Sequence, residues 1–115
     1  MIEEKHKDLF SVDESYHLAH CIASDLRMGA GIAVPMQMKF GLRTKLYQSK
    51  ESLESPTCIL TGRVFNLITK ARSSGKPTYQ SLQQSLLRMR EIVIEKDIKK
   101  IAMPKIGCGL DRLRR

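Results

Sequence analysis

Two glycine-rich segments hold the residues of this chain best suited to chemistry. The first is Met28-Gly29-Ala30-Gly31, and the second is Pro104-Lys105-Ile106-Gly107-Cys108-Gly109-Leu110. Because glycine lacks a Cβ, the backbone can approach a ligand closely and present several N–H groups to one anion. Two such segments could clasp a diphosphate from both sides, although these glycines could also serve tight turns only. Neither segment is a P-loop or a GxGxxG fingerprint, so the spacing indicates phosphate binding and no particular reaction.

The residues around the first glycine segment predict a strand followed by a helix. Tyr16–Ala23 (YHLAHCIA) is short and apolar, as expected of a buried strand. Ile32–Phe40 has a helical pattern, in which Pro35 is tolerable only within the first turn. A polar stretch follows, within which Ser49–Pro56 is interpreted as a loop. Met1–His6 (MIEEKH) is a poor candidate for a buried strand, since its only apolar residues are at its start.

The second half of the chain predicts three more strands and one long helix. Strands are expected at Thr57–Leu60, Val64–Thr69 and Ile98–Met103, and Ala71–Pro77 is expected to be a loop. Thr78 is a plausible N-cap for a helix whose apolar residues share one face at Leu82, Leu86, Met89 and Val93. This alternation predicts a single α/β domain over residues 1–115, with both glycine segments at the C-terminal ends of strands.

Composition restricts the classes of partner. The formal net charge is +8, which favours anions such as nucleotides, nucleic acid or acidic proteins, although a generically basic surface would look the same. No apolar run is long enough to span a membrane, so we expect no membrane partner. Three cysteines without CxxC spacing argue against a disulfide framework and a structural zinc site, so reduced thiols and no metal are expected. No cofactor is expected either.

Three longer blocks carry more information than the glycines alone. LAHCIASDLRMGAGIA (Leu18–Ala33), LITKARSSGKPTYQSL (Leu67–Leu82) and MPKIGCGLDRL (Met103–Leu113) together resemble the macro domains of the terminal ADP-ribose protein glycohydrolase family. The resemblance implies a three-layer α/β/α sandwich with a mixed central sheet and an ADP-ribose cleft at the C-terminal side of that sheet. It also implies a protein that acts on mono-ADP-ribosylated proteins and could bind poly(ADP-ribose). The expected reduced thiols fit a nuclear or cytoplasmic protein.

The resemblance assigns binding roles residue by residue. Asp8 matches the position that hydrogen-bonds the adenine, and Leu9 follows it. Gly29, Ala30, Gly31 and Ile32 match the first phosphate loop. The second loop, which also wraps the distal ribose, corresponds to Pro104, Ile106, Gly107, Cys108, Gly109 and Leu110. His20 and Ser24 match positions that line the cleft, although His20 could equally be a satisfied core histidine.

The resemblance also implies the chemistry. Lys70 matches a lysine that attacks C1″ of the distal ribose to form a covalent intermediate, and Asp111 matches an aspartate that helps to resolve it. Attack requires the neutral amine, which burial and neighbouring cations favour. The leaving group is a carboxylate, so no strong general acid is required. The alternatives are a reader that binds ADP-ribose without turnover, an inactive relative, and a basic module for nucleic acid.

The ends of the chain depart from the family pattern. The chain ends at Arg115, shortly after Asp111, whereas relatives continue with a helix and a strand that lies inside the sheet beside the N-terminal strand. Without them, strand edges would lack partners. We therefore expect a truncated macro-domain sheet, whose open edge could pair with a second copy to form a homodimer.

Overall fold

The computed structural model describes residues 3–5, 12–29, 33–72 and 74–103. Their core is a five-stranded mixed sheet with the order β1-β5-β2-β4-β3. The strands are β1 (Glu3–Lys5), β2 (His17–Ala23), β3 (Thr57–Thr61), β4 (Val64–Lys70) and β5 (Lys100–Ala102). β1, β5, β2 and β4 run parallel, and β3 pairs antiparallel with β4. This confirms the predicted mixed sheet.

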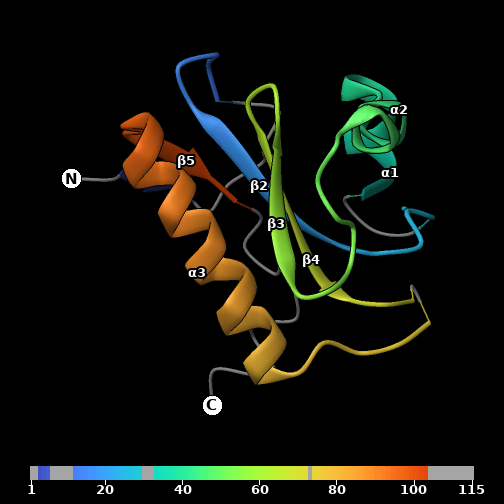
Figure 1. Ribbon diagram of the computed structural model, residues 1–115. Helices are drawn as coiled ribbons and strands as arrows, with labels where there is room; N and C mark the ends of the chain where they lie inside the picture. Colours follow the sequence, from blue (N-terminus) through green and yellow to red (C-terminus); the bar gives the residue numbers. More distant parts are fainter. Residues whose placement is uncertain (1–2, 6–11, 30–32, 73, 104–115) are drawn as a thin grey trace.

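Helices cover both faces of the sheet, which makes three layers (Figure 1). α1 (Ala33–Phe40) and α2 (Leu42–Gln48) lie on one face, and α3 (Tyr79–Lys96) lies on the other. α3 begins as predicted: the Thr78 side chain accepts from the Ser81 N–H, and the Ser81 side chain accepts from the Thr78 N–H. None of the helices in the described ranges is long and apolar enough to cross a bilayer.

Two elements differ from the sequence expectations. β1 forms where residues 1–6 were expected to be a poor strand, because Glu3–Lys5 pairs with Lys100–Ala102 and ends the sheet. An edge strand needs only backbone hydrogen bonds on one side and little apolar content. β5 therefore has β1 on one side and β2 on the other, and β1 is an edge strand of the described sheet. α2 also forms within a stretch interpreted as polar, where only Leu42 and Leu46 are buried.

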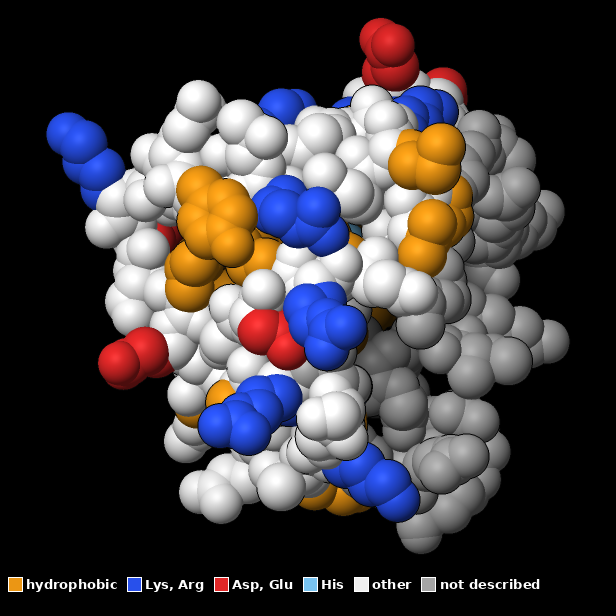
Figure 2. Space-filling view, turned by 90° about the vertical axis from the view of Figure 1, so that its right-hand side faces the viewer, with side chains coloured by type: hydrophobic (Ala, Val, Ile, Leu, Met, Phe, Trp, Pro, Cys, Tyr) orange, Lys and Arg blue, Asp and Glu red, His pale blue; other side chains and the backbone are white. Residues whose placement is uncertain are grey.

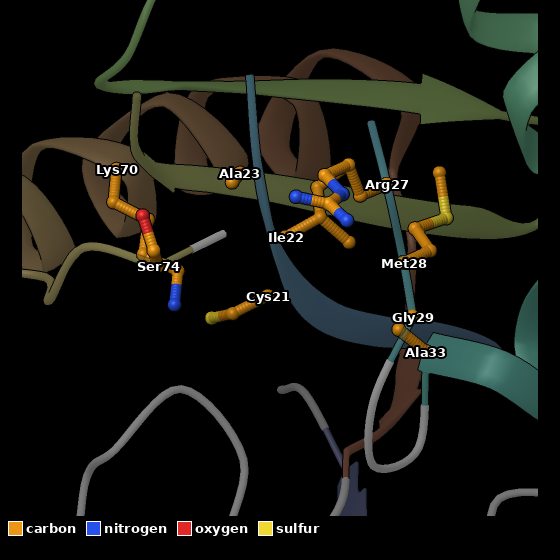
Figure 3. A pocket seen from close by; sticks show the side chains of 9 residues that line it. All are labelled: Cys21, Ile22, Ala23, Arg27, Met28, Gly29, Ala33, Lys70 and Ser74. Carbon is orange, nitrogen blue, oxygen red and sulfur yellow. The ribbon is translucent and has the colours of Figure 1, made fainter. Parts of the chain in front are cut away.

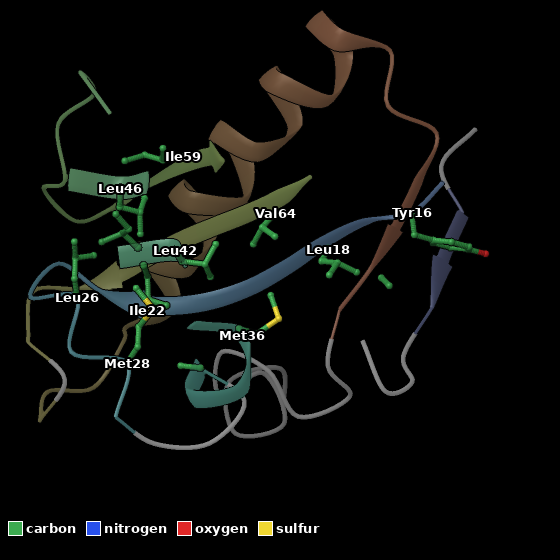
Figure 4. Close-up of a cluster of buried hydrophobic side chains, with 13 residues drawn as sticks. Tyr16, Leu18, Ile22, Leu26, Met28, Met36, Leu42, Leu46, Ile59 and Val64 are labelled. Carbon is green, nitrogen blue, oxygen red and sulfur yellow. The ribbon is translucent and has the colours of Figure 1, made fainter. Parts of the chain in front are cut away.

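The apolar core is split by the sheet into two clusters. The cluster under α1 and α2 joins Leu18 and Ile22 of β2 to Met36, Leu42 and Leu46 (Figure 4). The other cluster joins buried residues of the central strands to α3: Ala19, Phe65, Leu67, Ile92 and Val93. Alternation along β2 and β4 explains this division, since successive side chains point to opposite faces. The C-terminal ends of β2 and β4 are thereby fixed side by side.

Candidate functional site

A pocket of about 390 Å³ lies where β2 and β4 end (Figure 3). Strand β2 contributes its last three residues, and Lys70 is the last residue of β4. The remaining lining residues belong to the loop after β2, the start of α1 and the loop after β4: Arg27, Met28, Gly29, Ala33 and Ser74. The lining residues that the structure describes include two cations and no carboxylate, which suits an anionic ligand.

The loop after β2 has an unusual backbone. Leu26 and Met28 have φ angles of 56° and 47°, in the left-handed region that residues other than glycine rarely adopt. Each such residue costs on the order of 1 kcal/mol. Both side chains are buried in the cluster under α1 and α2, which offsets that cost. Asp25 adds a local hydrogen bond, because its Oδ1 accepts from the Arg27 N–H at 3.1 Å. The path that leads to Gly29 is therefore held by packing on α1 and α2.

Arg43 of α2 fixes the same loop from the side. Its Nε donates to the Leu26 carbonyl at 2.8 Å, and its Nη2 donates to the Arg27 carbonyl at 2.5 Å. Both are charge-assisted hydrogen bonds, which are stronger than neutral ones. In a trans peptide the N–H points away from the carbonyl, so these bonds direct the Met28 N–H away from α2. The guanidinium thus orients the peptides that precede the glycine segment.

Lys70 is half-buried at the C-terminal end of β4. Its Nζ donates to the Gly75 carbonyl at 3.1 Å, which ties the side chain to the loop after β4. The strand end itself is fixed by the Ser24 N–H, which donates to the Lys70 carbonyl at 2.9 Å. Lys70 and Gly29 line the same pocket, so the structure brings together one predicted catalytic residue and one predicted phosphate-loop residue. Their roles stay predictions.

His20 lies inside the sheet and outside this lining. It is fully buried, and its Nε2 lies 2.7 Å from Asn66 Oδ1. The Asn66 amide in turn donates to Thr61 Oγ1 at 2.9 Å and to the Ile59 carbonyl at 3.0 Å. Burial lowers the pKa of His20 to about 4, so the imidazole is neutral near pH 7. Its Nδ1 is buried without a hydrogen-bond partner among the described residues, so His20 is a core histidine that is only partly satisfied, and its role in the cleft stays a prediction.

Ser24 lines a neighbouring pocket of about 400 Å³ together with Leu53, Glu54, Ser55 and Ala71. Ala23, one residue earlier, lines the pocket that contains Lys70. β2 ends at Ala23, and its pairing with β4 shifts register between Ile22 and Ala23. Sequence reasoning could not locate that irregularity.

Several lining residues were not singled out from the sequence. Arg27 stands directly before the glycine segment that begins at Met28, so adjacency to that segment could have identified it. Cys21, Ala33 and Ser74 carry no comparable pattern. The other predicted site residues lie outside the described ranges: Asp8, Leu9, Ala30, Gly31, Ile32, Pro104, Ile106, Gly107, Cys108, Gly109, Leu110 and Asp111.

The cysteines correct one expectation. Cys21 is disulfide-bonded, so the prediction of reduced thiols throughout is wrong for this residue. The number of cysteines and their spacing say nothing about which of them meet in space. Cys58 is a free, buried thiol, and burial raises its pKa to about 12. Cys58 is therefore unreactive at neutral pH.

Comparison with known proteins identifies two sets of similar proteins, although no family model matches the chain. The chain is 48% identical over 109 residues to the ADP-ribose glycohydrolase OARD1 of Homo sapiens, covering 93% of the chain and 72% of that protein. For the Bos taurus protein of the same name, the identity is 46% over the same coverage. The fold is similar to the macrodomain of Mycobacterium tuberculosis DarG, with a TM-score of 0.75 at 18% identity over 95% of this chain and 78% of that one. The macrodomain of Thermus aquaticus DarG gives 0.72 at 18% identity over 95% and 79%.

Proposed function

The chain belongs to the macrodomain family of ADP-ribose glycohydrolases, and from this premise we propose that it hydrolyses the ester bond between ADP-ribose and acidic side chains of proteins. One observation supports the proposal above the others. Lys70 and Gly29, from segments far apart in the sequence, line one pocket with Arg27. A diphosphate beside Gly29 and Arg27 would leave the distal ribose free to extend toward Lys70.

In the proposed reaction, Lys70 is the nucleophile. Its neutral Nζ attacks C1″ of the distal ribose, and the bond from C1″ to the ester oxygen breaks. The acceptor carboxylate leaves with the electron pair of that bond. The proton lost by the amine passes to a base, a role that the resemblance gives to Asp111. Water then attacks C1″, displaces the amine and yields free ADP-ribose.

The test uses a protein that is ADP-ribosylated on glutamate, with release of ADP-ribose measured over time. Wild type should release it, and Lys70→Ala should lower the rate at least about 100-fold, as expected for loss of a nucleophile. Asp111→Ala should also be impaired. Lys99→Ala is the matched control, because Lys99 is 63% exposed, pairs with Asp97 and is absent from the pocket lining.

Calorimetry with free ADP-ribose completes the test. If ADP-ribose binds but wild type releases nothing, the chain is a reader and the hydrolase proposal is wrong. If Lys70→Ala retains the full rate, the pocket acts through another residue and the mechanism is wrong. If ADP-ribose does not bind at all, both the hydrolase proposal and the reader alternative are excluded.

A further inference from the structure

The helical layer beside the pocket carries positive charge and no negative charge. The sequence from residue 26 to residue 50 contains no Asp or Glu and contains Arg27, Lys39, Arg43, Lys45 and Lys50. This stretch includes the whole of α1 and α2. Lys45 forms no ion pair with any residue that the structure describes, and its side chain is exposed. A surface of one sign attracts a partner of the other.

Apolar side chains are exposed on the same two helices. Val34, Met38 and Tyr47 are 38%, 81% and 65% exposed. Figure 2, which views the molecule from the side of α1 and α2, shows lysine and arginine side chains lying between exposed hydrophobic ones, with an acidic side chain among them. The α1–α2 face is defined here by five residues: Val34, Met38, Lys39, Lys45 and Tyr47. Methionine and aromatic side chains are enriched in protein interfaces, so the mixture favours a polypeptide over a purely electrostatic contact with a polyanion.

The α1–α2 face adjoins the pocket. Ala33, the first residue of α1, and Arg27 both line it (Figure 3). A macromolecule that delivers an ADP-ribosyl group into the pocket therefore has this face beside its acceptor residue. The acceptor in the proposed reaction is an acidic side chain, and carboxylates that flank it would meet Lys39 and Lys45.

Resting on the proposed function, we infer that the preferred substrates are acidic protein segments, whose carboxylates flanking the modified residue dock on the α1–α2 face. The face thus selects among acceptors, while the pocket recognises ADP-ribose. Arg43 is not part of the selective set, because its guanidinium donates to the Leu26 and Arg27 carbonyls, so its replacement would also alter the loop that lines the pocket.

The experiment compares peptides that carry one ADP-ribosylated glutamate between flanks of either Glu or Gln. For wild type we expect kcat/KM to be about tenfold higher with the Glu flanks at low salt, and the difference to shrink at high salt. The Lys39→Gln/Lys45→Gln variant should reduce the difference to less than about twofold and leave affinity for free ADP-ribose unchanged. Tyr47→Ser should weaken both peptides. The matched control is Arg90→Gln/Lys96→Gln on α3, which removes the same charge from exposed positions of the other layer.

The possible failures are distinct. Equal kcat/KM for the two wild-type peptides would overturn the docking inference and leave the hydrolase intact. Equal loss in the α3 control would mean that net charge acts without a defined face, and would also overturn it. If single-stranded DNA competes with the Glu-flanked peptide but an unmodified Glu-rich peptide does not, the face binds nucleic acid. No hydrolysis of either peptide would mean that the proposed function itself fails.

Discussion

The two helical layers of this protein differ in length, ends and charge. α3 has 18 residues, a reciprocal cap at Thr78 and Ser81, and residues of both charges along its length. α1 and α2 have 8 and 7 residues, no acidic residue, and a left-handed Gly41 between them that supplies no side-chain cap. Yet the loop into the pocket is packed against α1 and α2, and Arg43 of α2 orients it. The regular layer supports the sheet, and the irregular layer carries the site.

The largest effect on stability is expected from two substitutions that each leave a cavity, one in each helical layer. Leu46→Ala beside the loop and Ile92→Ala under α3 should each lower the free energy of unfolding by about 2–5 kcal/mol, since both side chains are buried. Only Leu46→Ala should also weaken ADP-ribose binding, because Leu46 shares a cluster with Leu26 and Met28. Urea unfolding and calorimetry, below the melting temperature of both variants, provide the measurements. Equal losses of affinity would contradict the division between the layers.

The second prediction concerns the loss of stability at acidic pH. It rests on His20, which lies on the sheet face under α1 and α2. The pKa of His20 is lowered from 6.5 to about 4 by burial, so between these values the unfolded chain binds more protons than the folded one. Stability is therefore fully present above pH 6.5 and falls as the pH drops toward 4, by up to about 3 kcal/mol. Urea unfolding at a series of pH values measures it. His20→Gln, which can keep the bond to Asn66, should have a shallower slope in this window; identical slopes would refute the assignment.

Much of the fold could be predicted because local pattern and burial agree. β2, β4 and α3 are long and periodic, and the Thr78 cap is a local feature that the sequence displays directly. β1 and α2 could not be predicted, since β1 depends on pairing with β5, nearly a hundred residues away in sequence, and α2 has too few apolar residues to show a period.

The candidate site was predictable to a smaller extent. Gly29 and Lys70 were identified, and they line one pocket. The burial of His20 against Asn66 and the register shift between Ile22 and Ala23 are tertiary effects without a local pattern. Arg43 was missed for the same reason: its partners, Leu26 and Arg27, lie in another element.

The third prediction isolates the role of Arg43. Arg43→Gln should weaken ADP-ribose binding by about tenfold, because the loop before Gly29 loses two charge-assisted hydrogen bonds. Arg43→Lys should retain part of the affinity. Arg63→Gln is the matched control, since Arg63 also donates to two carbonyls, those of Asp13 and Tyr16, but at the start of β2. Calorimetry should find wild-type affinity for that control. A similar loss in both variants would mean that general loosening, and not the loop, determines affinity.

The smallest effect is expected at Arg88 of α3. Its Nη1 lies 3.0 Å from Glu91 and its Nη2 lies 3.8 Å from Glu51, but the arginine side chain is 40% exposed and the carboxylates are more exposed still. Exposed pairs of this kind contribute roughly 0–1 kcal/mol, so Arg88→Gln should change the free energy of unfolding by less than about 0.5 kcal/mol, and less at high salt. It should also leave kcat/KM for Glu-flanked peptides unchanged, whereas Lys45→Gln, an equal loss of charge on α2, should lower it. If Arg88→Gln lowered kcat/KM as much, the charge would act through the whole molecule, and the distinction between a supporting layer and a recognising layer would not hold.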